Sequence, residues 1–299
     1  MTPEVFAEWF RRQKHEVIRT ASSYWYDQGP HVYQAFPYHW VISPEERELN
    51  EFLLKYSALG LRYSTPLSAA HGALSYHTIY EEPEYGIDRL GKWARKNVRR
   101  GLKNCSVEPV SLERIADEGW ELQVNTLNRQ RRRIELDRKT WQRRFLSAKG
   151  LPGFEGWAAL IDGKLAASVM TFEMEDCCYM LFQQCLQEYL TEHVNNALSF
   201  TVSSTMMARP EINSIFYSLH SLDAPASIDE FKFRMGYHAK PVRQRVMFHP
   251  RLAIFFNSLS HSALRFARHI LPSNGALAKT EGMVRFYLQG KDRSKLQEV

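Results

Sequence analysis

The sequence contains little cysteine, and its four cysteines form no recognisable metal or redox motif. Cys105, Cys177, Cys178 and Cys185 include no Cys-x-x-Cys pair and no Cys/His cluster with the spacing of a structural zinc site. Cys177 and Cys178 are adjacent in a strand-like segment, so we expect their side chains to lie on opposite faces. The pattern argues against a metal site and predicts apolar thiols in a reducing compartment.

Long hydrophobic runs are also missing. No segment approaches the roughly 20 apolar residues that a transmembrane helix requires, and residues 1–14 mix glutamate and arginine with apolar residues, unlike a signal peptide. We therefore expect a cytoplasmic protein. The sequence also lacks Gly-x-Ser-x-Gly, a Walker-type loop and His-Glu-x-x-His, which excludes the serine hydrolases, nucleotide hydrolases and zinc peptidases that carry them.

What the chain does have is the composition of a folded, basic protein. Its 299 residues suffice for one large domain or two moderate ones. Hydrophobic residues at 44% and charged residues at 24% are ordinary for a globular protein. The formal net charge of +6 suits an anionic partner, namely a nucleotide, a nucleic acid or an acidic membrane surface, but it also serves solubility alone.

The first half of the chain mixes helices with aromatic, strand-like segments. We predict an amphipathic helix over 3–20 and a second one that begins at Ser43, where a capping residue precedes proline and two glutamates, and that reaches Leu59. The break at Leu151-Pro152-Gly153 is a candidate boundary. Further strands are expected at 61–64, 73–80 and 106–110, and further helices at 88–103, 111–128 and 137–148.

The second half is dominated by strands. Asp162-Gly163 predicts a two-residue hairpin turn between strands at 157–161 and 164–175. Ser227-Ile228-Asp229-Glu230 has the spacing of a capping box and opens a short helix that Gly236 ends. The remaining elements are strands at 177–186, 213–219 and 237–248 and a helix at 192–207. The chain thus divides into segments 1–60, 61–150, 151–250 and 251–299.

The order of elements from Trp157 onward resembles the core of the GNAT acyltransferase superfamily. Phe231-Lys232-Phe233-Arg234-Met235-Gly236-Tyr237, and the basic helix and strand over 93–107, are similar to its FemABX-like and CelD-like branch. The resemblance covers about residues 60–248. It implies an α/β (α+β) fold with a mixed sheet flanked by helices, in two GNAT-like halves of which the first (61–150) is degenerate.

The same resemblance implies a bacterial N-acyltransferase. Its activated acyl group comes from acyl-CoA, as cosubstrate without a tightly bound cofactor, and its amine acceptor is a small molecule or a cell-envelope or polysaccharide precursor. An aminoacyl-tRNA-dependent transferase of the FemABX type is the alternative. The rival of another class is a catalytically inactive scaffold that binds a nucleotide, nucleic acid or protein.

One departure from the family bears on the donor. GNAT enzymes place a glycine-rich loop before the helix at 192–207, and its N–H groups hold the pyrophosphate of acyl-CoA. Gln187–Asn196 contains no glycine here, and Glu188 and Glu192 oppose an anion. The basic segments 95–103 and 129–144 suit a tRNA donor, although basic runs are more often solvated helix faces.

Three residues are candidates for catalysis. His220 and Asp223 follow an apolar strand, where a histidine oriented by an aspartate serves as general base or merely fastens a loop. Lys232 takes the lysine position of the FemABX-like motif, in which the lysine approaches a phosphate or the reacting group; an exposed helix lysine is the alternative. A backbone N–H on Leu181–Leu186 is expected to stabilise the oxyanion.

Four further residues are candidates for binding. Gln183 interrupts an apolar strand, so it needs a partner that is either a substrate or a structural hydrogen bond. Arg234 contacts an anionic substrate group or is a solvated charge. Asn195 and Asn196, near a helix start, bind the donor or cap the helix.

The segment 251–271 reads as one amphipathic helix. Its apolar residues alternate with Arg265, Arg268 and several histidines. Such a helix packs on the domain or lies on an anionic membrane at the inner membrane face.

Overall fold

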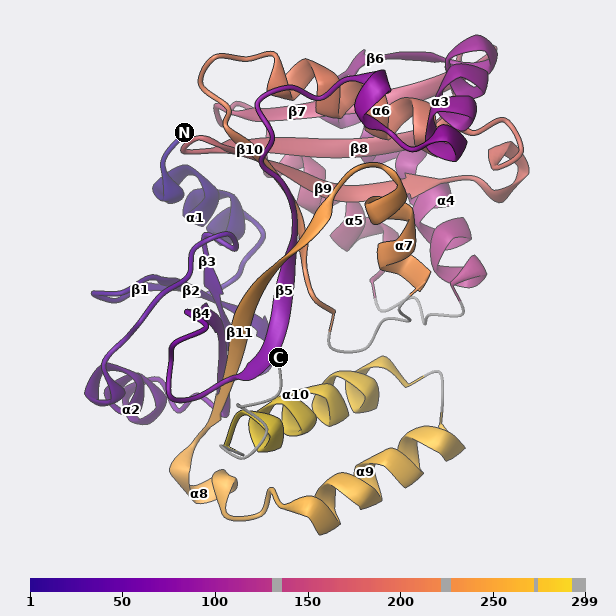
Figure 1. The fold of residues 1–299 in the computed structure, drawn as a ribbon. Helices are drawn as coiled ribbons and strands as arrows, with labels where there is room; N and C mark the ends of the chain where they lie inside the picture. Colours follow the sequence, from indigo (N-terminus) through magenta and orange to yellow (C-terminus); the bar gives the residue numbers. More distant parts are fainter. Residues whose placement is uncertain (131–135, 222–226, 272–273, 292–299) are drawn as a thin grey trace. The chain divides into compact units, whose positions relative to one another are not determined.

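The computed structural model describes residues 1–130, 136–221, 227–271 and 274–291 (Figure 1). Its contacts divide the chain into two units. Unit 1 comprises residues 1–9, 78–218 and 225–239, and unit 2 comprises residues 10–77, 219–224 and 240–299. Each unit is assembled from separate stretches of the chain, so the boundaries of the units do not follow the consecutive segments.

The sheet of unit 1 has the strand order β10-β9-β8-β7-β6 in the part of the chain described. Neighbours from β6 to β9 are antiparallel, whereas β9 and β10 are parallel. Because β6 pairs with β7, the break at 151–153 lies inside unit 1. The strands are β6 (Ser106–Val110), β7 (Phe154–Ile161), β8 (Lys164–Met174), β9 (Cys177–Cys185) and β10 (Ser214–Leu219).

Helices cover both faces of this sheet. Ala159 packs into the cluster of α6 (Val194–Met207) and α3 (Lys92–Asn104), whereas its neighbour Ala158 packs with Leu122 of α4 (Leu112–Arg129). Adjacent strand residues point to opposite faces, so α6 and α4 lie on opposite sides of the sheet, and the central strands are buried on both faces. The helices α5 (Arg138–Leu146) and α7 (Ser227–Arg234) also belong to unit 1, as do residues 3–9 of the N-terminal helix.

The predicted hairpin is confirmed. Ile161 pairs with Lys164, and the two residues between them, Asp162 and Gly163, both have positive φ, at 50° and 75°. Positive φ at both central positions defines a type I′ turn, whose twist matches that of the flanking strands. The local sequence therefore sets the pairing next to the turn, as far as Leu160 with Leu165, beyond which the register shifts by one residue at Ala159.

Unit 2 is built on a second set of strands, in the order β1-β2-β3-β4-β11-β5 within the described residues. Its core is aromatic: Trp25, Tyr33, Phe52 and Tyr63 pack with Leu49 of α2 (Glu46–Lys55). The strands are β1 (Val17–Arg19), β2 (Tyr24–Gly29), β3 (Val32–Phe36), β4 (Gly60–Thr65), β5 (Ala73–Tyr80) and β11 (His238–Phe248). The boundary between the units falls within β5, β10 and β11.

Three short or weakly patterned regions differ from expectation. The first helix, α1 (Pro3–Arg12), ends early because Lys14 has a φ of 72° and the chain then forms β1. The second, α2, begins at Glu46 because Glu45, not Ser43, is its N-cap. The tail is not one helix but α8 (Pro250–Ala253) and α9 (Ser258–Ile270), followed by the unexpected α10 (Gly275–Lys291).

All four thiols are free, and Cys177, Cys178 and Cys185 are buried. Burial raises the pKa of Cys105, and that of Cys178 well above its usual value. Among the described residues, no group of three or more His, Cys, Asp or Glu side chains is arranged to hold a metal ion.

Candidate active site

Strands β9 and β10 run parallel but separate along their length. The register pairs Cys177–Tyr179 with Ser214–Phe216, and within the described residues no pair continues beyond them. β9 nevertheless extends to Cys185 and β10 to Leu219. Backbone groups at the diverging ends can therefore bind something other than the neighbouring strand. The divergence falls within the stretch expected to hold the oxyanion donor.

A bulge lies in the same part of β9. Ser168 of β8 pairs with Gln184 but Met170 pairs with Leu181, so β9 carries one extra residue. Phe182 has a φ of 53°, in the left-handed region, and the guanidinium of Arg144 lies 4.2 Å from the centre of its ring. Bulges and left-handed non-glycine residues cluster next to active sites, where they redirect side chains.

The Gln183 side chain joins β9, β10 and α6. Its Oε1 accepts hydrogen bonds from the Tyr217 hydroxyl at 2.6 Å and from Ser199 Oγ at 3.1 Å. Its Nε2 donates to Ser199 Oγ at 2.9 Å and Asn195 Oδ1 at 3.3 Å. Burial raises the pKa of Tyr217 well above its usual value, so the phenol stays a neutral donor. Gln183 thus has structural partners, and its predicted substrate contact stays a prediction.

We predict that Gln183→Leu lowers the free energy of unfolding by about 1–3 kcal/mol, because it removes partners of Tyr217 and the buried Ser199 hydroxyl. Chemical denaturation of the variant measures the effect. Gln187→Leu, at an exposed position just after β9, is the control and should change stability by less than about 0.5 kcal/mol. Equal effects of the two substitutions would contradict the network.

Lys232 is buried rather than exposed. Its side chain is 10% exposed, and its Nζ donates to Asp229 Oδ1 at 2.6 Å and to Ser218 Oγ at 2.7 Å. Nζ also lies 5.1 Å from the centre of the Tyr217 ring. Burial lowers the pKa of Lys232, and Asp229 opposes that shift. The exposed-lysine alternative is wrong; the catalytic role of Lys232 stays a prediction.

Neither candidate asparagine caps α6. The N-cap is His193, which has a φ of 58° and makes no side-chain cap. Asn195 Nδ2 donates to Cys185 Sγ at 2.9 Å, and Asn196, only 6% exposed, donates to Met235 Sδ at 3.3 Å. Both side chains are held within unit 1, and their contact with a donor stays a prediction.

Helix α3 packs directly on the start of α6. A Cβ added at Gly101 would lie 2.5 Å from the His193 carbonyl oxygen, so only glycine allows this approach. Asn104 Nδ2 also donates to Glu192 Oε2 at 2.6 Å. Glu192 and His193, at the end of the segment that replaces the glycine-rich loop, are therefore in direct contact with α3.

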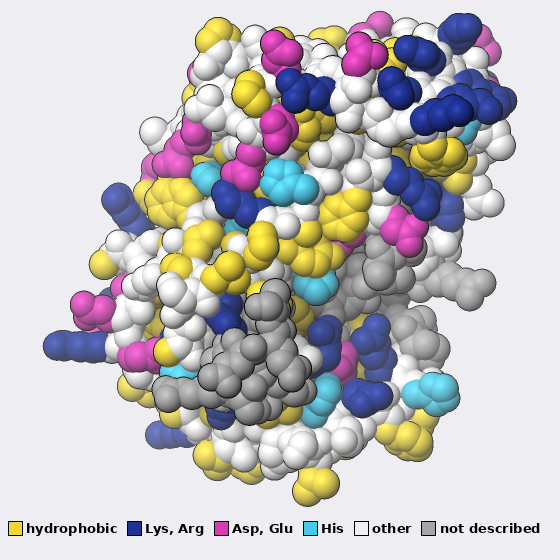
Figure 2. Space-filling view, in the orientation of Figure 1, with side chains coloured by type: hydrophobic (Ala, Val, Ile, Leu, Met, Phe, Trp, Pro, Cys, Tyr) yellow, Lys and Arg dark blue, Asp and Glu magenta, His cyan; other side chains and the backbone are white. Residues whose placement is uncertain are grey.

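The outward surface of α3 is basic and carries an aromatic ring. The helix contains no acidic residue, and Trp93 is 53% exposed. The Arg234 guanidinium lies 5.1 Å from the centre of the Trp93 ring and pairs with Glu230 at 3.0 Å. Dark blue side chains gather at the upper right of Figure 2, where Figure 1 places α3. The exposed basic residues are Lys92, Lys96, Arg99, Arg100 and Lys103.

His220 belongs to unit 2, whereas the other described candidates belong to unit 1. Its ring stacks on Tyr76, with 4.4 Å between ring centres, and its Nδ1 lies 3.2 Å from Ser75 Oγ. Its backbone N–H donates to the Tyr76 carbonyl at 3.0 Å. Through these contacts His220 packs against β5. Asp223 lies outside the described residues.

A surface cleft of about 580 Å³ opens at the carboxyl end of β9. Leu186 and Tyr189 line it from the strand side, and Trp120 of α4 lines it from the other. Charges of both signs surround it, including Arg114 and Glu188. The cleft has the size of a small-molecule site and lies immediately after the bulged strand.

The fold is similar to that of several solved structures. FemX matches with a TM-score of 0.56 at 9% identity, over 84% of this chain and 92% of that one. The C-terminal DUF2156 domain of a protein designated lysylphosphatidylglycerol synthetase, from Agrobacterium fabrum, matches with a TM-score of 0.55 at 11% identity, over 97% and 93% of the two chains. The chain has a GNAT-like fold. L-PGS from Bacillus licheniformis matches with a TM-score of 0.52 at 9% identity, over 83% and 92%.

The GNAT-like fold, which FemX shares, confirms the sequence-based expectation of a mixed sheet flanked by helices. No family model matches the chain, and no curated protein matches it either. The likeness therefore concerns the fold.

Sequence reasoning missed Tyr217, Ser199 and Asp229, which belong to the polar cluster of unit 1. Tyr217 and Ser199 are separated from Gln183 by many residues, so no local pattern joins them. Asp229 precedes Lys232 by three residues, and this spacing places two side chains together on a helix. The ion pair between them could therefore have been predicted from the sequence.

Proposed function

We propose that the chain is an aminoacyl transferase that takes its aminoacyl group from a tRNA. The observation that carries the proposal is the basic face of α3, which covers the start of α6 where a CoA-binding loop would lie. Lysine and arginine with an exposed tryptophan suit a phosphate backbone and a stacked base. Aminoacyl rather than acetyl transfer is also supported by the likeness to the C-terminal domain of a protein designated lysylphosphatidylglycerol synthetase.

In the proposed reaction an acceptor amine attacks the ester carbonyl of the aminoacyl-tRNA directly. The tetrahedral oxyanion accepts a hydrogen bond from a backbone N–H of β9 beyond Tyr179, where β10 no longer pairs. The ester C–O bond then breaks, and the proton that the attacking amine loses passes to the departing tRNA oxygen, which leaves as a hydroxyl. Tyr217 and Lys232 lie beside this strand end as neutral and cationic donors. The acceptor we propose is a cell-envelope precursor.

Binding of tRNA is tested by fluorescence anisotropy over a range of salt concentrations. Arg99→Glu/Lys103→Glu on α3 should weaken tRNA binding at least tenfold. It should also reduce the slope of the logarithm of the binding constant against the logarithm of the salt concentration by about two. Lys14→Glu/Lys55→Glu, at two exposed lysines outside both basic segments, is the control with the same charge change and should have little effect. Equal weakening by both pairs would contradict recognition by α3.

Transfer is tested with radiolabelled aminoacyl-tRNA and, separately, radiolabelled acetyl-CoA, each with a cell-envelope extract as acceptor. Label should move to the acceptor from tRNA and not from acetyl-CoA. Transfer from acetyl-CoA that survives the α3 substitutions would favour the acyl-CoA-dependent enzyme instead. Binding of tRNA without any transfer would indicate an inactive scaffold.

A further inference from the structure

The outer face of α9 exposes a continuous apolar stripe. Leu259, Phe266 and Ile270 are 80%, 67% and 60% exposed, and Ala263 between them is exposed too. At 3.6 residues per turn these four positions fall within an arc of about 60°. The stripe is therefore one face of the helix rather than a scatter of surface residues.

The segment before α9 extends the apolar surface. Ile254 is 73% exposed and Phe255 is 64% exposed, and Leu271 after the helix is 53% exposed. Elsewhere in the described part of the chain, the most exposed large hydrophobic side chain is Leu54, at 62%. Yellow and dark blue side chains both reach the surface in the lower part of Figure 2, where Figure 1 places α8 and α9. A concentration of this kind marks an interaction surface.

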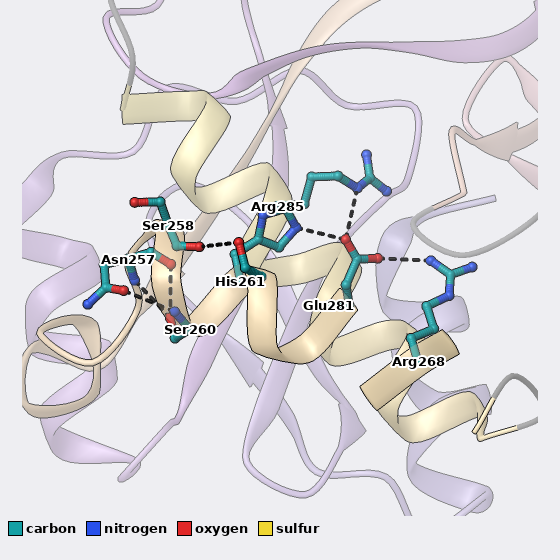
Figure 3. Close-up of polar contacts among 8 residues, drawn as sticks. Asn257, Ser258, Ser260, His261, Arg268, Glu281 and Arg285 are labelled. Atoms are coloured by element: carbon teal, nitrogen blue, oxygen red, sulfur yellow. Dashed lines mark hydrogen bonds and ion pairs between the residues drawn. The ribbon is translucent and has the colours of Figure 1, made fainter. Parts of the chain in front are cut away.

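The inner face of α9 is fixed, so the stripe cannot turn inward. Figure 3 shows side chains of α9 and α10 meeting at the carboxylate of Glu281. His261 Nε2 lies 2.8 Å from Glu281 Oε1, Arg268 Nη1 donates to Oε2 at 2.9 Å, and Arg285 Nε lies 3.6 Å from Oε1. At 100° per residue, His261 and Arg268 lie opposite the apolar stripe.

A capping box starts the helix at a defined residue. Asn257 Oδ1 accepts from the Ser260 N–H at 3.0 Å, and Ser260 Oγ accepts from the Asn257 N–H at 2.9 Å. The stripe is thus presented on an ordered helix, and little ordering entropy remains to be lost on binding.

The segment that forms α8, α9 and α10 has a positive net charge. From residue 250 to residue 291 the sequence has one acidic residue, Glu281, which is 3% exposed and surrounded by cations. Arg251 and Arg265 are exposed. The six basic residues of this region are Arg251, Arg265, Arg268, Lys279, Arg285 and Lys291.

We propose that α8 and α9 lie in the surface of an anionic bilayer. Leu259, Phe266 and Ile270 enter the acyl-chain boundary, and the exposed side chains of Arg251 and Arg265 meet lipid phosphates. A second copy of the chain is a poor occupant, because two such surfaces would bring their positive charges together with no exposed acid to pair them. Among the described residues no helix is long and apolar enough to cross a bilayer, so the contact we propose is with one leaflet.

Co-sedimentation with vesicles tests the proposal in the absence of tRNA, so its outcome is independent of the proposed enzymatic function. The full chain should bind vesicles of phosphatidylcholine with phosphatidylglycerol, bind vesicles of phosphatidylcholine alone at least tenfold more weakly, and lose affinity as salt is raised. Equal binding to both vesicles, or none to either, would overturn the proposal.

Paired variants test whether vesicle binding depends on the apolar stripe or on exposed apolar side chains in general. Leu259→Ser/Phe266→Ser should weaken binding at least tenfold, whereas Leu54→Ser/Leu74→Ser, at two other exposed leucines, should not. Arg265→Glu should weaken binding to anionic vesicles about tenfold, and the exposed Lys55→Glu should not. Unchanged binding of the stripe variant would refute α9 as the contact.

A fluorescence experiment complements the variants that should lose vesicle binding. Phe266→Trp keeps the apolar stripe and should show a blue-shifted emission on anionic vesicles, as its ring leaves water. Unshifted emission on bound vesicles would refute insertion. If light scattering instead shows a dimer that Leu259→Ser/Phe266→Ser dissociates, without vesicle binding, the stripe is a self-association surface and the lipid proposal fails.

Discussion

Replacing Lys232 by methionine should lower the free energy of unfolding by about 3–5 kcal/mol, because it removes the ammonium group that neutralises the buried Asp229 carboxylate. Asp229→Leu should cost a similar amount for the reciprocal reason. The double variant Lys232→Met/Asp229→Leu should recover most of the loss, since a buried ion pair can be replaced by apolar side chains at little net cost. Urea denaturation of the four proteins gives the coupling energy.

The same double variant shows whether Lys232 has a role in the reaction or only in stability. If the Lys232 ammonium acts on the reacting groups, the stable double variant should transfer at least about 100-fold more slowly than the natural protein. A normal transfer rate in that variant would leave Lys232 with a structural role alone. Glu230→Ala/Arg234→Ala removes an exposed pair from the same helix, with side chains 59% and 54% exposed, and should change stability by less than about 1 kcal/mol.

Acidification should destabilise unit 2 through His77. This side chain is 1% exposed, and its Nε2 lies 2.7 Å from Ser64 Oγ. Burial lowers the pKa of His77 to about 3, and the nearby charges of His39, Lys240 and Arg62 add to the shift. Between the ordinary pKa of 6.5 and about 3, the unfolded chain binds a proton that the folded protein does not. The stability is therefore complete above this range and is lost as the pH falls.

The expected slope from His77 is about 1.4 kcal/mol per pH unit within that range, or about 2 kcal/mol of lost stability near pH 5. Urea midpoints measured from neutral pH to near pH 4 check it. His77→Gln keeps a partner for Ser64 without a titrating ring, so its stability should depend less on pH. His71→Gln, at an exposed histidine, should leave the dependence unchanged, and an unaltered slope in His77→Gln would show that another group is responsible.

Local signals in the sequence predicted many elements closely, and long-range contacts account for what they missed. Strands at 73–80 and 106–110 have the predicted bounds, and Ser111 and Asp137 cap the helices that follow them. In contrast, α10 contains three glycines and lacks a clear apolar stripe, because it is buried on several sides. Its helical state depends on packing against residues distant in the sequence, which a short stretch of sequence does not show.

The candidate site was likewise predicted only in part. The sequence predicted an oxyanion donor within residues 181–186, and both the bulge and the strand divergence lie there. It could not show where the β9–β10 pairing ends, because that register is set by contacts between strands far apart in the chain. Likewise, the sequence shows that the glycine-rich loop is missing, but it does not show that α3 packs on the start of α6. Gly101 has the appearance of an ordinary interruption of a helix until its contact with His193 is known.

The pairing of β4 has a consequence for synthesis on the ribosome. One edge of β4 pairs with β3, which emerges earlier, but its other edge pairs residue for residue with Arg243–Phe248 of β11. That edge is unsatisfied until β11 has been synthesised, and an exposed strand edge promotes misassociation. The sheet of unit 2 therefore cannot be completed before β11 emerges, and a nascent chain stalled before β11 should be a client for chaperones that shield strand edges.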